Sequence, residues 1–169
     1  MQYRAVPKNG DKLSALGFGL MRLPQKVGKI DEQRAISQIR YAIDQGVNYF
    51  DTAPPYHAGE SERVLGKALQ DDYRDRVKVA TKLSPFMLNT AADMERMLSN
   101  QLSKLQTDHI DYYLLHALDA ASWKKLVGFN VLDFLQKAQS DGRIVNLGFS
   151  FHGSLATFKE IIDANDWTM

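Results

Sequence analysis

The chain has 169 residues, 44% of them hydrophobic and 24% charged, which is enough for one folded domain with a buried core. Its 21 lysines and arginines nearly cancel its 20 acidic residues, so the net charge of +1 gives no indication of a nucleic-acid partner. The lack of cysteine excludes disulfides, cysteine-ligated zinc, iron–sulfur clusters and thiol catalysis within these residues.

The N-terminus and the hydropathy pattern indicate where in the cell the protein is located. The first ten residues lack the apolar core of a signal peptide. No apolar run approaches the roughly 18 residues of a membrane-spanning helix. We therefore expect a cytoplasmic protein that binds neither a membrane nor nucleic acid.

The first third of the chain predicts a hairpin and then two strands joined by a helix. Asn9-Gly10-Asp11 separates two short extended runs and is a good hairpin signal. Asp31 is placed to cap the helix, and Gly46 is placed to end it. The expected elements are, in order, a hairpin over 3–14, a strand over 16–19, a helix between 31 and 46, and a strand over 47–51.

The remaining sequence alternates helices and strands. Ser61 and Ser154 are placed to cap helices, and Thr90 with Asp93 resembles a capping box. The helix after Thr90 carries a stripe that we interpret as core packing: Met94, Met97, Leu98, Gln101, Leu102 and Leu105. The other expected elements are a helix over 61–69, strands ending at Lys82, His116 and Ser150, a helix or helix pair between 123 and 138, and a last helix over 154–162.

These elements repeat as strand then helix, with the strand ends at nearly constant intervals. A parallel strand needs a crossover of a dozen or more residues, normally a helix. Mostly apolar strands at such spacing favour a (β/α) barrel. The alternative is a flavodoxin-like doubly wound sheet, but the G-x-G-x-x-G phosphate loop that often follows an early strand is not in the sequence. We expect one domain over residues 1–169.

Ionisable residues end successive strands. Taken singly, Asp51 reads as a turn residue, Tyr56 as a surface tyrosine, Lys82 as a solvated lysine and His116 as a core histidine. In a barrel, however, the carboxyl ends of the strands converge on one mouth, where active sites lie. Four ionisable groups would then share one pocket, which favours a catalytic role for the set.

Four motifs at these strand ends resemble a known family. They are Asp51-Thr52-Ala53-x-x-Tyr56, Ala80-Thr81-Lys82, Asp111-Tyr112-Tyr113-Leu114-Leu115-His116, and Gly142-Arg143-Ile144 with Gly148-Phe149-Ser150. Together, in this order and over residues 13–163, they resemble the aldo-keto reductase superfamily. Residues 3–24 further resemble a bacterial and archaeal branch, many of whose members carry a C-terminal ferredoxin-like extension.

The resemblance implies a (β/α)8 barrel, NADPH as hydride donor, and reduction of aldehydes or ketones to alcohols. It implies the catalytic residues Asp51, Tyr56, Lys82 and His116, with Tyr56 as general acid. It also implies cofactor contacts, with Ser150 at the nicotinamide carboxamide and the loop from Gly19 to Arg22 near the nicotinamide ribose. The residues implied to bind cofactor are Gly19, Met21, Arg22, Asp51 and Ser150.

The residue types suit that chemistry. Hydride addition to a carbonyl leaves an alkoxide that must be protonated, and a tyrosine in water, with a pKa of about 10, is a poor acid at neutral pH. A lysine ammonium beside a phenol stabilises the phenolate, and a carboxylate holds the lysine charged. A histidine can donate to the carbonyl oxygen and orient it.

The sequence departs from the family pattern in two ways. Phe151-His152 follows Ser150 where the family often has Asn, so either His152 replaces that polar contact or the contact is missing. The chain also supplies five of eight barrel strands, against about 250 residues for a typical barrel. We expect an N-terminal portion of a longer reductase, weakly active or inactive alone.

Three further expectations concern metals, self-association and the alternative to an enzyme. We expect no metal in this chain, with an iron–sulfur cluster only in a missing C-terminal extension. An open sheet would leave unpaired edges that invite self-association. The alternative to an enzyme is a non-catalytic binding or regulatory module on the same partial barrel.

Overall fold

The computed structural model describes residues 1–169, and its centre is a sheet of five parallel strands. Neighbouring strands in the sheet also follow one another along the chain, as in a barrel. The predicted repeat of strand and helix is confirmed, and the fold is the first five units of a (β/α) barrel. The strands are β3 (Phe18–Gly19), β6 (Tyr49–Asp51), β7 (Lys78–Leu83), β8 (Ile110–Leu118) and β9 (Ile144–Phe151).

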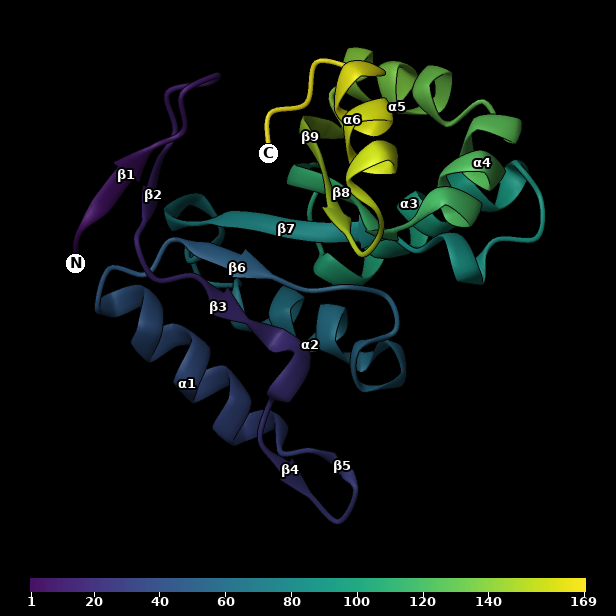
Figure 1. The fold of residues 1–169 in the computed structure, drawn as a ribbon. Helices are drawn as coiled ribbons and strands as arrows, with labels where there is room; N and C mark the ends of the chain where they lie inside the picture. The colour runs from purple at the N-terminus through teal and green to yellow at the C-terminus, as the bar shows by residue number, and fades with distance from the viewer.

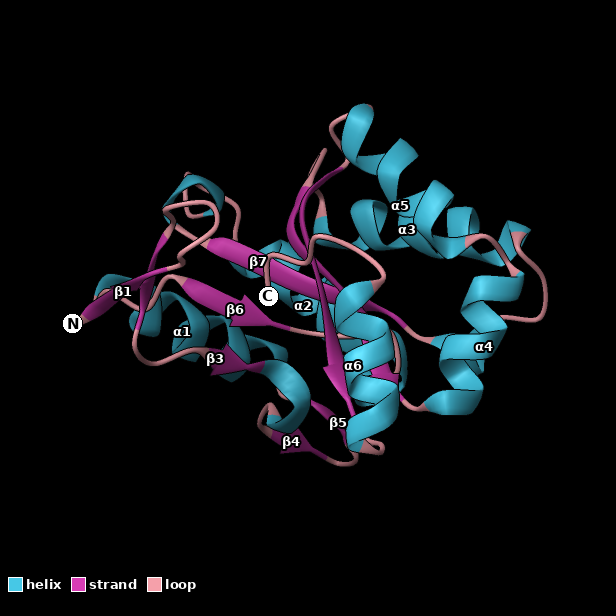
Figure 2. Cartoon of the chain, turned by 45° about the horizontal axis from the view of Figure 1, so that its top comes forward, coloured by secondary structure: helices cyan, strands magenta, loops and turns pink.

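Helices connect these strands and pack against the sheet. Figure 1 shows α1 and α2 beside β3 and β6, with α6 close to β9, and Figure 2 shows α1 and α2 behind β3 and β6. Their apolar stripes bury residues such as Ile39 and Leu98 completely. No helix is long and apolar enough to cross a membrane. The helices are α1 (Glu32–Asp44), α2 (Glu60–Ala68), α3 (Ala92–Leu105), α4 (Ala120–Gly128), α5 (Val131–Ser140) and α6 (Leu155–Asp163).

The predicted N-terminal hairpin is formed by β1 (Tyr3–Ala5) and β2 (Lys12–Ser14), which pair antiparallel. Its turn lies against the amino-terminal ends of β8 and β9. The Asn9 amide donates to the Tyr112 hydroxyl at 3.0 Å and to Oδ1 of Asn146 at 2.9 Å, and the Tyr112 hydroxyl donates to Asp11 at 2.7 Å. The hairpin therefore covers the end of the sheet opposite the predicted site.

A second hairpin follows β3 where the sequence predicted a loop. It consists of β4 (Gln25–Lys26) and β5 (Lys29–Ile30) and projects at the bottom of Figure 1. Val27 and Gly28 form its two-residue turn with φ of 52° and 73°, the left-handed pair that a tight hairpin turn requires. Strands of two mostly polar residues carry no alternating pattern, so the sequence offered little to detect them.

The helix ends follow the predicted caps in two cases and differ in two. Asp31 accepts from the Arg34 N–H, and Ser154 accepts from the Thr157 N–H, as predicted. At Thr90 only half of the capping box forms, because Asp93 accepts from the Thr90 N–H but the Thr90 side chain does not cap α3. Ser61 lies inside α2, where it is fully buried and bonds elsewhere.

The outer edge of β9 is engaged by the last residues of the chain. The Thr168 N–H donates to the Leu147 carbonyl at 2.8 Å, and the Phe149 N–H donates to the Met169 carbonyl at 3.2 Å. Together with a bond from the Met169 N–H to the Leu147 carbonyl at 3.3 Å, they hold Met169 beside Gly148. A Cβ at Gly148 would come within 2.3 Å of the Met169 carbonyl oxygen, so this contact requires a glycine there.

Candidate active site

The structure brings the four predicted catalytic residues together at the carboxyl end of the sheet. Asp51 is the last residue of β6, and Lys82 is the last but one of β7. Tyr56 begins η2 (Tyr56–Gly59), a short turn that follows the Pro54-Pro55 loop, and His116 lies near the end of β8. Because β6, β7 and β8 are parallel neighbours, their ends meet at one edge.

The Lys82 ammonium is the centre of this cluster. It is 5% exposed and donates to Oδ1 of Asp51 at 2.6 Å and to the Tyr56 hydroxyl at 3.3 Å. Its third acceptor is the Thr52 carbonyl at 2.9 Å. Sequence reasoning missed Thr52, because a backbone carbonyl has no signature in the side-chain pattern. The three acceptors account for all three hydrogens of the ammonium.

Tyr56 is held over Lys82 by an unusual backbone turn. The three residues after it, His57, Ala58 and Gly59, have φ of 51°, 54° and 91°, and left-handed conformations are costly for the first two. Nε2 of His57 accepts from the Leu23 N–H at 3.1 Å, which ties this turn to the end of η1 (Leu20–Arg22). The Lys82 Nζ lies 4.9 Å from the Tyr56 ring centroid.

His116 is aimed at Tyr56 by a bulge in β8. The register with β9 shifts between Leu115 and Leu118, and Ala117 has a left-handed φ of 52°. The Ala117 N–H, which the bulge removes from the hydrogen bonds between β8 and β9, donates to Oγ of Ser150 at 2.7 Å. The His116 and Tyr56 rings meet edge to face, with their centroids 6.1 Å apart.

The environment of His116 keeps its imidazole neutral. Burial, followed by the nearby charge of Lys82 and then His152, lowers the pKa of His116 from 6.5 to about 4. Nδ1 of the ring lies 2.8 Å from Oγ of Ser84, a fully buried residue directly after β7, and either atom can be the donor. Sequence reasoning missed Ser84, although it stands two residues after Lys82.

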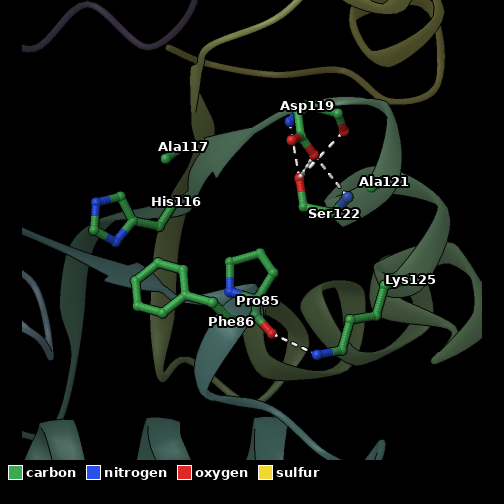
Figure 3. A pocket seen from close by; sticks show the side chains of 8 residues that line it. All are labelled: Pro85, Phe86, His116, Ala117, Asp119, Ala121, Ser122 and Lys125. Carbon is green, nitrogen blue, oxygen red and sulfur yellow. Dashed lines mark hydrogen bonds between the residues drawn. The ribbon is translucent and has the colours of Figure 1, made fainter.

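A cavity of about 330 Å³ opens beside His116, as Figure 3 shows. Phe86, 63% exposed, covers one side of it with its ring centroid 5.7 Å from that of His116. Lys125 lies across the cavity from the histidine and extends toward Pro85, where it donates to the Pro85 and Leu88 carbonyls, so its charge stabilises the loop after β7. The cavity thus combines an apolar wall with a neutral imidazole.

The predicted cofactor residues fall into two groups on either side of these four. Gly19 pairs with Asp51 in the sheet, and Met21 and Arg22 follow it in η1, all three exposed. Ser150 lies on β9 beside the His116 bulge. No atom stands within 4 Å of where a Cβ of Gly19 would be, so the backbone there is open to approach.

The family resemblance implies that these groups hold the nicotinamide end of a dinucleotide. Ser150 accepts from the Ala117 N–H and retains its own hydrogen, which suits donation to a carboxamide oxygen. His152 is exposed, so it is free to contact a ligand but makes no side-chain hydrogen bond here. No group of three or more histidine, aspartate or glutamate side chains is arranged to hold a metal ion.

Known proteins are similar to this chain in sequence and in fold. A model described as "Aldo/keto reductase family" matches residues 15–168. L-galactose dehydrogenase of Arabidopsis thaliana is 32% identical over 156 residues, which cover 89% of this chain and 48% of that protein. Aldo-keto reductase YhdN of Bacillus subtilis is 36% identical over 125 residues, covering 69% of this chain and 38% of that protein. The chain thus spans less than half the length of these curated relatives.

Solved structures are similar to this chain in fold. An aldo-keto reductase from Bacillus halodurans, in its holo form, superposes with a TM-score of 0.82 at 27% identity, covering 99% of this chain and 55% of that one. One from Klebsiella pneumoniae, in complex with NADPH, gives a TM-score of 0.78 at 28% identity, covering 98% and 55%. With the strand order and the cluster around Lys82, these matches show that the chain belongs to the aldo-keto reductase family.

Proposed function

We propose that these residues form the catalytic part of an NADPH-dependent oxidoreductase that reduces small aldehydes or ketones to alcohols. The observation that carries the proposal is the Lys82 ammonium, which joins the Asp51 carboxylate, the Thr52 carbonyl and the Tyr56 hydroxyl. A buried lysine held by a carboxylate and directed at a phenol is the arrangement that proton donation by tyrosine requires.

Tyr56 is the general acid in this proposal. Its oxygen accepts from Lys82, so its own hydrogen remains to donate to a substrate carbonyl oxygen. As the proton leaves, the ammonium stabilises the phenolate that forms. Asp51 and Thr52 act through Lys82, since they fix the ammonium and do not face the phenol oxygen themselves.

His116 orients the carbonyl from the second side. The neutral ring has one N–H. We assign the Ser84 hydroxyl as donor to Nδ1, which places the ring hydrogen on Nε2, free for the substrate oxygen. Phe86 then forms one wall of the substrate space.

NADPH fits the site through the residues at its nicotinamide end. The Klebsiella pneumoniae relative was solved with this cofactor. Here Gly19, Met21, Arg22 and Asp51 would lie on one side of it and Ser150 on the other. When bound, NADPH supplies the hydride. We propose that the 169 residues alone are weakly active or inactive, because the chain spans less than half the length of its curated relatives.

The test uses the chain alone and a chimera in which it replaces the matching 55% of the Bacillus halodurans reductase. The chimera should oxidise NADPH in the presence of an aldehyde, and Tyr56→Phe should lose most of that rate while NADPH fluorescence titration shows unchanged binding. Tyr41→Phe, at an exposed position on α1, is the matched control. Undiminished turnover in Tyr56→Phe would reject Tyr56 as the acid. A chimera that binds NADPH but reduces no carbonyl would favour a non-catalytic module.

We also propose that the chain self-associates through its open sheet edge. β3 pairs only with β6, so its other edge presents unpaired backbone groups. Sedimentation velocity should show a dimer or larger species at micromolar concentration. A folded monomer would reject the proposal. The cytoplasmic location remains a proposal and is testable by fractionating the producing cells.

A further inference from the structure

A buried polar network lies behind β7, on the side of the sheet away from the site. Its members are Thr81 on β7, Glu62 on α2, Gln101 on α3 and Tyr113 on β8, and each is at most 1% exposed. Buried polar side chains in such numbers are retained only where their hydrogen bonds are satisfied. One atom is an exception, since Oε2 of Glu62 has no hydrogen-bond partner.

The network reaches the backbone of Lys82 through Gln101. Nε2 of Gln101 donates to the Lys82 carbonyl at 2.9 Å. One residue earlier, Thr81 donates from its hydroxyl to Oε1 of Glu62 at 2.7 Å. The same network therefore holds the Thr81 side chain and the Lys82 carbonyl at the end of the strand from which the ammonium extends.

The sheet itself leaves the Lys82 carbonyl without a partner. The Ala80 carbonyl accepts from the Thr52 N–H at 2.8 Å, where β6 ends. Two residues on, the Lys82 carbonyl faces the same side, beyond the end of β6. A buried carbonyl needs a hydrogen bond, and the Gln101 amide supplies it.

The orientation of the Gln101 amide is fixed from both ends. The Tyr113 hydroxyl donates to its Oε1 at 2.8 Å, and Oε1 of Glu62 accepts from its Nε2 at 3.0 Å. A flipped amide would place its oxygen against the Lys82 carbonyl and its NH2 group against the Tyr113 hydroxyl. The NH2 group of Gln101 is thus held facing the Lys82 carbonyl.

We propose that Gln101 is a positioning residue for Lys82, sustaining the contact of the ammonium with Tyr56 by holding the Lys82 carbonyl where β6 no longer supports β7. A catalytic role for the contact between the ammonium and Tyr56 rests on the proposed function. The contact itself is present in the structure and does not depend on that proposal. Gln101 touches neither the phenol nor the ammonium, and it acts through the backbone.

The test measures the contact directly in the 169-residue chain by NMR. The nuclear Overhauser cross-peak between the Lys82 ε-protons and the Tyr56 ring protons reports the separation of the two side chains. Gln101→Met keeps the length and volume of the side chain but removes the amide, and it should weaken this cross-peak at least threefold. Gln38→Met, at an exposed position on α1, is the matched control and should leave it unchanged.

Two further variants complete the test. Glu62→Gln retains an oxygen that accepts from Gln101, so its cross-peak should match the wild type. Tyr113→Phe frees the amide to rotate and should weaken the cross-peak, and it carries the test should Gln101→Met not fold. A wild-type cross-peak in folded Gln101→Met, or in Tyr113→Phe where that variant carries the test, would overturn the proposal. Because this readout needs no turnover, an inactive chimera would reject only the proposed function.

Discussion

The hydroxyl of Ser84 lies 2.8 Å from Nδ1 of His116, in a position where solvent does not reach the serine. This pair decides which ring nitrogen of His116 carries the hydrogen. Long-range ¹H–¹⁵N spectra at pH 7 should show His116 as the Nε2–H tautomer. Ser84→Ala should produce a mixture with the Nδ1–H form, while Ser103→Ala, at an exposed position on α3, should not. A pure Nδ1–H tautomer in the wild type would contradict the assignment.

The pH dependence of stability should carry the signature of His116. Its pKa is about 4 in the folded chain, lowered mainly by burial, against about 6.5 for an unfolded histidine. Between these values the unfolded state binds more protons, so the free energy of unfolding decreases as pH falls from 6.5 towards 4. His116→Gln should remove on the order of 1 kcal/mol of that decrease, a value reduced because the ring is partly exposed.

Urea unfolding at pH 7 and pH 4.5 measures this difference. His152→Gln is the comparison, because His152 is the smallest of the three causes that lower the pKa of His116, so its removal should change the pH slope less than His116→Gln does. Equal slopes for His116→Gln and the wild type would show that another group causes the acid destabilisation.

Glu62 should destabilise the chain at neutral pH. Burial raises its pKa, partly offset by the hydrogen bonds from Thr81 and Gln101 and by the charges of Lys104 and Lys82. A carboxyl group with a raised folded pKa contributes stability below its unfolded pKa, and loses that contribution as pH rises through the folded pKa. Glu62→Gln should therefore stabilise the chain at pH 7, by about 1–2 kcal/mol, with little effect near pH 4.

Denaturant unfolding at both pH values checks this sign. Glu60→Gln on the same helix turn is the control, because Glu60 is exposed and pairs with Arg63 at the surface. Such surface pairs contribute at most about 1 kcal/mol. A loss of stability at pH 7 in Glu62→Gln would show that the ionised carboxylate is favourable where it lies.

Ala117→Gly should stabilise the chain or leave it unchanged, by about 0–1 kcal/mol, because glycine adopts the left-handed φ of 52° without strain. Ala117→Val should destabilise it by about 2 kcal/mol, since a β-branched side chain is disfavoured there. Thermal unfolding of both variants, with Ala121→Val at an exposed position on α4 as control, measures the difference. Equal effects for the two valine variants would argue against backbone strain.

Periodicity revealed most of the architecture. The apolar runs and helical stripes predicted every strand of the main sheet, because apolar runs alternate with helical stripes at nearly constant intervals along the chain. The β4–β5 hairpin was missed, since its two-residue strands are mostly polar and leave no apolar run in the sequence, unlike the equally short β3. Ser61 was read as a cap because serine favours that position, yet its hydroxyl bonds to Thr52 and to the Leu20 carbonyl.

The residues of the candidate site also divide into those that the sequence predicted and those that it did not. Side chains at strand ends, such as Asp51 and Lys82, could be assigned because topology alone brings those ends together. Thr52 could not, because a backbone carbonyl is common to every residue. Gln101 was visible as one polar residue in an apolar stripe, but its partner is a carbonyl that only the end of β6 leaves free.

Because all three hydrogens of the Lys82 ammonium are already donated, they also limit which donors a ligand can reach. An entering oxygen ligand finds no vacant N–H on this lysine. The phenol hydrogen of Tyr56 remains vacant beside this charge. Arginine would not substitute at this position, since its planar guanidinium cannot direct donors at three acceptors arranged around a point. On the proposed function, a substrate oxygen therefore bonds to the Tyr56 hydroxyl and to the Nε2–H of His116, and the charge of Lys82 acts on it without a direct hydrogen bond.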